Sequence, residues 1–583
     1  MHTNTNRENT ERGGFLDFFA RYRYECALVL ISVTSASLMA WYVSTKHLTT
    51  ALADEVAHMI FARILIDSMT PGVSQLGTWP PLLHVVMAPF SLSDFLFRTG
   101  LMGAAALIPF FAMGSVFLYR LLLELSGRKI LSFLGTLLYV FNPFVLYYAS
   151  VPMTEILFMS MLFGTAYFFT LWMKYERLRY ILLTALFVTL TCLSRYEGLL
   201  LIPVLVFMLW VQMYRKKKTY SESEALTVLY GVLAAVGMVL IVLNSWAFAG
   251  SPLAFAGIGN GEVWNLSINS DLTQHSVLSS VNFFLHASFY MLGKFFVPLS
   301  LFCAILAIAL VKKKTIVAAA FVALLVPFAA VVSSLYRGSA AIYTPEFLSY
   351  VGFHNTRYGL TWIGFAVAAV TLMAVGVREY LAVHVRQKWV SVLVIPVFAI
   401  FVFTITGVHF YRTAFASNFS VIRDDLSATS RDQKNPVAVY LKEHYTGGKI
   451  LATRFNHDYT LLDSDIPLKN YIYEGNFIYF DEVLGRPWLY TPWVIMTNPT
   501  SPDRVRAKDP VSDKWEGSVY FKNFYTMVYK TPETVLYQLK IPAVEKYIQE
   551  NHLNEAYVPS LHPNMQTWDP KTIEQKMGLV NNK

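Results

Sequence analysis

Long apolar stretches without a charged residue constrain this chain more than any other feature. They recur along the first 411 of its 583 residues, and a helix needs about 20 such residues to cross about 30 Å of hydrocarbon. Only 15% of the residues are charged, against about 25% in a soluble globular chain. The runs are Cys26–Thr45, Thr99–Tyr119, Ile130–Thr154, Ile156–Met173, Tyr180–Ser194, Gly198–Tyr214, Ala225–Ala249, Phe295–Val311, Thr315–Tyr336, Tyr358–Val377 and Trp389–Tyr411. The sequence therefore predicts a polytopic α-helical membrane protein with about eleven transmembrane helices.

Two apolar segments have more than one interpretation. Tyr180–Ser194 is short for a span and could be partly re-entrant. Val281–Gly293 could be an interfacial helix or a long start to the span that follows it. Both alternatives leave the predicted fold class unchanged.

Basic residues indicate which side of the membrane each loop faces. The formal net charge is +9, and the basic residues cluster in alternate short loops, as the positive-inside rule expects of cytoplasmic loops. The clusters are Arg120/Arg128/Lys129, Lys174/Arg177/Arg179, Arg215/Lys216/Lys217/Lys218, Lys312/Lys313/Lys314 and Arg378/Arg386/Lys388. We predict a multi-pass plasma-membrane protein with a cytoplasmic N-terminus. Because the rule explains the basic residues, we do not expect nucleic acid as a partner.

The last part of the chain has a different character. Residues 412–583 contain no run long enough to span, and they alternate short helical and strand patterns. "NPVAVYLKEHY" reads as a helix, and "KILATRF", "WVIMTN" and "FYTMVYKT" read as strands. The sequence thus predicts a membrane domain over 1–411 and a small α/β domain over 412–583, which eleven spans place outside the cytoplasm.

Ionisable residues collect at the ends of the runs that face away from the basic loops. Such groups cost a few kcal/mol each at membrane depth, so they usually face a wet cavity or a partner. They are Asp54, Glu55, Glu155, Arg195, Glu197, His354 and Arg357. Their placement predicts a polar chamber at the extracytoplasmic surface.

The first of these loops begins with Asp54-Glu55, and two interpretations are open. Asp54 could cap a helix over 55–68, because Asp accepts backbone N–H bonds well at that position. It could also be a general base that takes a proton from an attacking hydroxyl. His58 lies one turn further on the same helical face, so the two side chains could share a hydrogen bond or a metal ion.

Two further positions have similar alternatives. "GTWPPLLHVV" is typical of a rigid turn with an interfacial anchor, and His84 behind it is either hydrogen-bonded structure or a ligand. Glu155 in "VPMTEILF" is either a helix-start carboxylate favoured by the helix dipole, or a group that binds sugar hydroxyls or a cation.

Two outer arginines suggest phosphate chemistry. Arg195 and Glu197 in "CLSRYEGLL" form either a salt-bridged turn or, through Arg195, a phosphate contact, since guanidinium makes a charge-assisted fork with phosphate oxygens. Arg357 in "FHNTRYGLTW" either snorkels or meets a phosphate. We include His354 and Tyr358 beside it among the candidate substrate-binding residues.

With these residues in hand, the chain resembles the C-type superfamily of integral-membrane glycosyltransferases (GT-C), most of all the protein mannosyltransferases and the lipid A aminoarabinose transferases. The resemblance covers roughly residues 20–411. It rests on the order and spacing of "DE" at 54–55, "PPLLH" at 80–84, "MTEILF" at 153–158, "SRYEG" at 194–198 and "NTRYGL" at 355–360.

The resemblance implies transfer of a sugar from a polyprenyl-phosphate carrier to an acceptor hydroxyl outside the cytoplasm, usually with inversion. It implies Asp54 as the base, Glu55 as a neighbouring substrate-binding carboxylate, and Arg195 and Arg357 as ligands of the lipid phosphate. Glu155 and His84 match positions that line the cavity. Some members use a divalent metal, for which His58, His84 and Glu155 are the candidate ligands here.

The sequence also departs from parts of this superfamily. The tryptophan-rich WWDYG motif of the oligosaccharyltransferases is missing, which argues against transfer of a whole oligosaccharide. The acceptor could be a glycan, a lipid or a protein. A lipid-linked glycan flippase or transporter, and a surface-glycan ligase or polymerase, are the alternative functions; a transporter would place its polar residues near the bilayer midplane.

Overall fold

The computed structural model describes residues 20–72, 75, 79–253, 272–311, 314–347, 352–429, 433–501, 509–562, 565 and 569–579. Its contacts divide the chain into two compact units. The first, which we call the helical unit, comprises Met1–Ala53, Pro80–Leu83 and Thr99–Thr429. The second, which we call the sheet unit, comprises Asp54–Trp79, His84–Arg98 and Ser430–Lys583. The predicted boundary after residue 411 stays a prediction.

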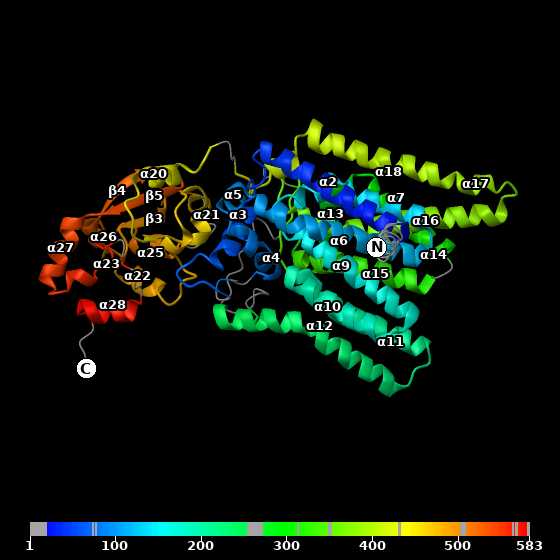
Figure 1. Ribbon diagram of the computed structural model, residues 1–583, viewed down its shortest axis with the longest axis horizontal. Coiled ribbons are helices and arrows are strands. Elements are labelled where there is room, and N and C mark those ends of the chain that lie inside the picture. The colour runs from blue at the N-terminus through cyan, green and yellow to red at the C-terminus, as the bar shows by residue number, and fades with distance from the viewer. Residues whose placement is uncertain are drawn as a thin grey trace, which may run out of the picture. The chain divides into compact units, whose positions relative to one another are not determined.

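Apolar helices that run side by side build the helical unit (Figure 1). Within the described residues, eight segments are long and apolar enough to cross a membrane, and a bent pair makes up to nine. The eight are α2 (Arg23–Thr45), α6 (Leu101–Ser126), α9 (Glu155–Tyr175), η2 with α11 (Tyr196–Arg215), α12 (Tyr220–Ala247 of Tyr220–Ala249), α15 (Lys314–Tyr336), η5 with α16 (Thr356–His384) and α17 with α18 and η6 (Trp389–Ala416). The chain is a polytopic α-helical membrane protein.

The predicted number of about eleven spans is higher than this count, and three segments explain the difference. The run Ile130–Thr154 is divided between α7 (Lys129–Val140) and α8 (Pro143–Tyr148), because Asn142 caps a new helix whose first residue is a proline. The run Tyr180–Ser194 forms α10 (Leu178–Ser194), which has 17 residues. The third is a pair, α13 (Val277–Leu292) and α14 (Phe296–Leu310), which are bent by 102° at the break between them.

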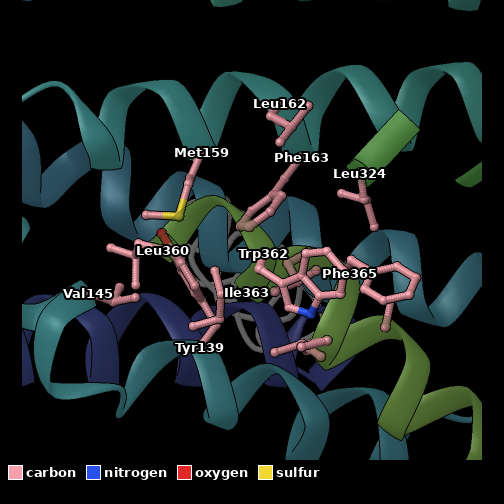
Figure 2. Close-up of a cluster of buried hydrophobic side chains, with 14 of the residues drawn as sticks. Tyr139, Val145, Met159, Leu162, Phe163, Leu324, Leu360, Trp362, Ile363 and Phe365 are labelled. Carbon is pink, nitrogen blue, oxygen red and sulfur yellow. The ribbon is translucent and has the colours of Figure 1, made fainter. Parts of the chain in front are cut away.

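Large side chains from several helices fill the core of the helical unit. Figure 2 shows Met159, Leu162 and Phe163 of α9 close to Trp362, Ile363 and Phe365, where η5 (Thr356–Trp362) continues into α16 (Ile363–His384). The Trp362 indole N–H donates to the Ser300 hydroxyl at 3.0 Å, so this buried polar group is satisfied. The core thus fixes η5 firmly against α9.

Ion pairs connect the basic loops with one another. Arg120 pairs with Glu25, Lys174 with Glu124, Lys216 with Glu176, and Arg128 with Glu379. Each pair joins helix ends that the alternation of loop charge assigns to the same side. The side that faces the cytoplasm stays a prediction.

Short backbone bridges gather the opposite ends of these helices. Leu52 pairs with Ala428, Phe353 with Asp425, and Tyr343 with His354. In η5, Gly359 lies against α13 so closely that a Cβ atom there would be 2.4 Å from the carbonyl carbon of Ala287. This end of the bundle is therefore held by backbone contacts as well as by side chains.

The sheet unit is built on a five-stranded sheet with strand order β2-β1-β3-β5-β4. β1 (Ile450–Leu451), β2 (Tyr471–Ile472) and β3 (Trp493–Thr497) are parallel, whereas β5 (Thr534–Leu539) is antiparallel to both β3 and β4 (Tyr525–Lys530). Figure 1 shows β3, β5 and β4 next to each other. The predicted α/β domain is confirmed.

The remaining elements of the sheet unit are short helices and turns. They are α3 (Ala53–Ile64), α4 (Leu82–Ser91), α5 (Asp94–Thr99), α20 (Pro436–His444), α21 (Arg454–Asp463), η7 (Leu468–Asn470), α22 (Phe480–Gly485), α23 (Pro487–Tyr490), α25 (Pro510–Trp515), α26 (Val519–Phe524), α27 (Ile541–Glu550), η8 (Glu555–Tyr557) and α28 (Pro570–Met577).

The secondary structure predicted from the sequence of this unit is only partly confirmed. The predicted helix over 435–445 is α20, capped by the side chain of Asn435. Of the predicted strand "KILATRF", only the two residues of β1 form a strand, because α21 starts at Arg454. The prediction for "WVIMTN" and "FYTMVYKT" as strands is confirmed by β3 and β4.

Candidate functional site

Glu155 is the centre of a buried ion-pair cluster in the helical unit. It is the first residue of α9 and only 3% exposed. Its Oε1 atom accepts from Arg195 Nη1 at 2.6 Å and lies 3.3 Å from Arg357 Nε. Its Oε2 atom has no hydrogen-bond partner among the described residues. A buried carboxylate oxygen in this state is suited to accept a hydrogen bond from a bound molecule.

Arg195 directs three nitrogen atoms at protein acceptors. Nε and Nη2 donate to Glu197 Oε1 at 3.2 and 2.8 Å, and Nη1 donates to the Thr154 hydroxyl as well as to Glu155. The guanidinium also lies over the Tyr358 ring, 4.8 Å from its centre. Of the two interpretations of "CLSRYEGLL", the salt-bridged turn is thus present.

Arg357 approaches the same carboxylate from η5. The 3₁₀-helix begins after Asn355, which has a left-handed backbone conformation with φ of 51°, and it places Arg357 and Tyr358 next to the start of α9. Residues from three separate parts of the chain, at 155, 195–197 and 357–358, therefore meet at one end of the bundle.

His354 lies close by in the chain and has a carboxylate neighbour. Its Nδ1 is 3.5 Å from Asp425 Oδ1, and its Nε2 is 3.0 Å from the side-chain amide of Asn355. Asp425 also accepts hydrogen bonds from the backbone and hydroxyl of Ser427. The sequence arguments missed Asp425; the available signal was an acidic residue soon after the last apolar run.

Asp54 and Glu55 belong to the first turn of α3 in the sheet unit. Asp54 is partly buried, whereas Glu55 is fully buried. The residue before Asp54 is tied to the helical unit, because the Ala53 N–H donates to the Ser427 carbonyl at 3.0 Å. The chain therefore leads from the polar end of the bundle directly into Asp54.

His58 and His84 form a pair within the sheet unit. His58 Nδ1 is 2.9 Å from His84 Nε2, and the rings of Trp79 and Phe61 lie against them. Burial, followed by the charges of His58 and Arg454, lowers the pKa of His84 well below its usual value, so this imidazole stays neutral. The observed hydrogen bond favours the structural interpretation of His84.

The predicted metal ligands His58 and His84 have few ring nitrogens left to bind a metal ion in this arrangement. The hydrogen bond between the two imidazoles leaves one ring nitrogen on each for other contacts. Within the described ranges, no three His, Cys, Asp or Glu side chains are close enough together to hold a metal ion. Metal binding by His58, His84 or Glu155 stays a prediction.

Comparisons with known proteins give likenesses of fold. No protein-family model matches the sequence, and no curated protein matches it. One similar solved structure is the archaeal oligosaccharyltransferase AglB from Archaeoglobus fulgidus in complex with an inhibitory peptide and a dolichol-phosphate. Its TM-score is 0.48 at 11% identity, over 90% of this chain and 75% of that chain.

A second similar structure is ArnT from Cupriavidus metallidurans in the apo state. Its TM-score is also 0.48, at 12% identity, over 88% of this chain and 98% of that one.

Proposed function

We propose that this protein is a membrane glycosyltransferase that moves a sugar from a polyprenyl-phosphate carrier to an acceptor hydroxyl on the extracytoplasmic face of the plasma membrane. The observation that carries the proposal is the cluster of Glu155, Arg195 and Arg357 at one end of an apolar helical bundle. A lipid-linked sugar phosphate has an apolar tail and an anionic head. It therefore suits a site where hydrocarbon and buried guanidinium groups meet.

Arg357 is the stronger candidate for the phosphate contact. Arg195 is engaged with three acceptors and stacked on Tyr358, so its main role is to hold Glu155. Negative charge develops on the departing phosphate during transfer, and a cation placed there stabilises the transition state. Glu155 Oε2 would accept a hydrogen bond from a hydroxyl of the donor sugar. Glu197, His354 and Tyr358 complete the proposed substrate-binding set.

Asp54 is our proposed general base, with Glu55 as a second substrate-binding carboxylate. An inverting transfer needs one base on the acceptor side of the anomeric carbon. The carboxylate of Asp54 would take the proton of the acceptor hydroxyl as the new glycosidic bond forms. The bond from sugar to phosphate breaks at the same time, and the carrier leaves as polyprenyl phosphate.

The base is tested by transfer of a labelled sugar from a polyprenyl-phosphate donor, with the full chain in nanodiscs. Asp54→Asn should lower kcat by about 10²- to 10⁴-fold, the usual contribution of a general base. Normal turnover by a folded Asp54→Asn protein would rule out the carboxylate as base.

The phosphate contact is tested with the same donor. Arg357→Ala should lower kcat/KM by roughly 10- to 100-fold, because a hydrogen bond to a charged group contributes about 1.5–3 kcal/mol. Arg337→Ala is the matched control, since Arg337 is exposed in the same unit. Equal effects of the two substitutions would exclude a specific phosphate contact by Arg357.

The same assay separates a transferase from a flippase. A transferase releases polyprenyl phosphate together with a glycosylated acceptor, whereas a flippase moves the intact carrier-linked sugar across the bilayer. Treatment with a chelator during the assay tests whether a divalent metal takes part.

A further inference from the structure

The segment between the first two long apolar helices packs as part of the sheet unit. Its polar side chains are hydrogen-bonded to the C-terminal part of the chain. The Gln75 side chain accepts from the Tyr473 hydroxyl at 2.6 Å and donates to the Gly475 carbonyl at 3.1 Å. Asp67 accepts from the backbone N–H groups of Leu468 and Lys469. Asp54–Trp79 and His84–Arg98 therefore belong to the same compact unit as the chain that follows residue 430.

Arg454 contacts α3 directly. Its guanidinium carbon lies 3.8 Å from the centre of the Phe61 ring, a cation–π distance. Its side chain is 9% exposed, and its Nε is 3.8 Å from Asp458 Oδ1. The backbone N–H of Arg454 donates to Glu474 at 2.9 Å, which fixes the start of α21. Arg454 thus connects the start of α21 to α3.

A chain of ring contacts leads from Arg454 back to the first turns of α3. The Phe61 ring is stacked on His84, with centres 4.9 Å apart, and His84 is hydrogen-bonded to His58. His58 is one helical turn after Asp54 on the same face. These contacts therefore connect Phe61 with the helical turn that follows Asp54.

We propose that Arg454 is a positioning residue, through which the C-terminal domain sets the position of α3 and of Asp54. This inference depends on the proposed role of Asp54 as base. Misplacement of a reacting group by about 1 Å can cost 10²-fold in rate, so a domain that holds α3 in place contributes to catalysis without contact to substrate. The role of the C-terminal domain is then to hold α3, which carries Asp54, in place.

The test combines amide hydrogen exchange with kinetics on the full chain in nanodiscs. In Arg454→Met, exchange in 56–64 should become about 10-fold faster or more, because local opening of α3 becomes easier. The kcat should fall about 10-fold while the KM for the donor changes less than about 2-fold, since the chemical step and not donor binding is affected. Arg454→Lys keeps the charge beside Phe61 and should restore most of both values. Lys546→Met is the control, because Lys546 is 76% exposed in the same domain.

The two proposals fail in different ways. Unchanged exchange of α3 in a folded Arg454→Met protein would overturn the positioning role, whatever Asp54→Asn does. Normal kcat together with faster exchange would also overturn it. Full activity of Asp54→Asn would reject the base and leave the exchange result intact. If Arg454→Met does not fold, Phe61→Leu removes the same contact from α3, and the same outcomes apply.

Discussion

Replacement of Arg195 by methionine gives a direct measure of the buried ion-pair cluster. Methionine keeps much of the side-chain volume and removes the charge and every donor. Glu155 and Glu197 would then be buried without their main cation. Their side chains are 2% and 11% exposed in the native protein, so solvent cannot replace the positive charge and the hydrogen-bond donors of the guanidinium.

The expected loss follows from the geometry. Arg195 makes four hydrogen bonds to three side chains, two of them to Glu197 in a fork. Removal of one partner from a buried ion pair costs about 3–5 kcal/mol, because it leaves a buried charge unpaired. Arg128→Met is the comparison, since its pair with Glu379 is 43% and 32% exposed and such pairs contribute about 0–1 kcal/mol.

The assay is equilibrium denaturation in detergent micelles, followed by tryptophan fluorescence. The double variant Arg195→Met/Glu197→Gln should be more stable than Arg195→Met alone, because it removes one of the two unpaired carboxylates. A destabilisation by Arg195→Met no larger than that of Arg128→Met would refute the picture of a buried, mutually dependent cluster.

Two further predictions concern Asp458 and Gly359. Burial raises the pKa of Asp458 from its ordinary value near 4 to about 7. Its contribution to stability is therefore fully present below about pH 4 and is lost as the pH rises through about 7. Asp458→Asn should therefore stabilise the protein at pH 8, by at most about 4 kcal/mol, and have little effect near pH 4, which thermal unfolding at the two pH values can check. Gly359→Ala should destabilise the contact of η5 with α13 by about 1–3 kcal/mol, because the new methyl group meets backbone atoms, and denaturation should detect this loss. Gly407→Ala is the control and should cause no loss of stability, since a methyl group there meets nothing within 4 Å.

The apolar runs made the fold class predictable, because every backbone group in a bilayer must be bonded within its own helix. Hydropathy alone could not predict how α13 bends into α14 or how α7 stops at Asn142, since caps and glycines decide both. The length of the two-residue strand β1 could not be predicted either, because a short strand depends on its neighbours in the sheet more than on its own sequence.

The candidate site shows the same limit. The sequence pointed to Glu155, Arg195 and Arg357 by the side on which each loop lies, and the structure brings these three together. The sequence left open whether Arg195 pairs with Glu197 or binds a phosphate, and it did not predict the hydrogen bond from Arg195 to Thr154, because both depend on side-chain geometry. The sequence arguments missed Arg454, since nothing in "ATRFNHD" distinguishes an arginine that contacts a helix nearly 400 positions earlier.

The long-range hydrogen bonds at the polar end of the bundle have a consequence for biosynthesis. The Tyr42 hydroxyl donates to the carbonyl of Ala414, 372 positions later, and the Ala53 N–H donates to Ser427. Ribosomes add about 5–20 residues per second, so residues 42–53 wait roughly 20–80 s for these partners to be made. The end of the bundle that leads into Asp54 is therefore completed only when translation has passed nearly the whole membrane part. A ribosome that stalls before codon 427 would leave an inserted set of helices whose polar end has never closed.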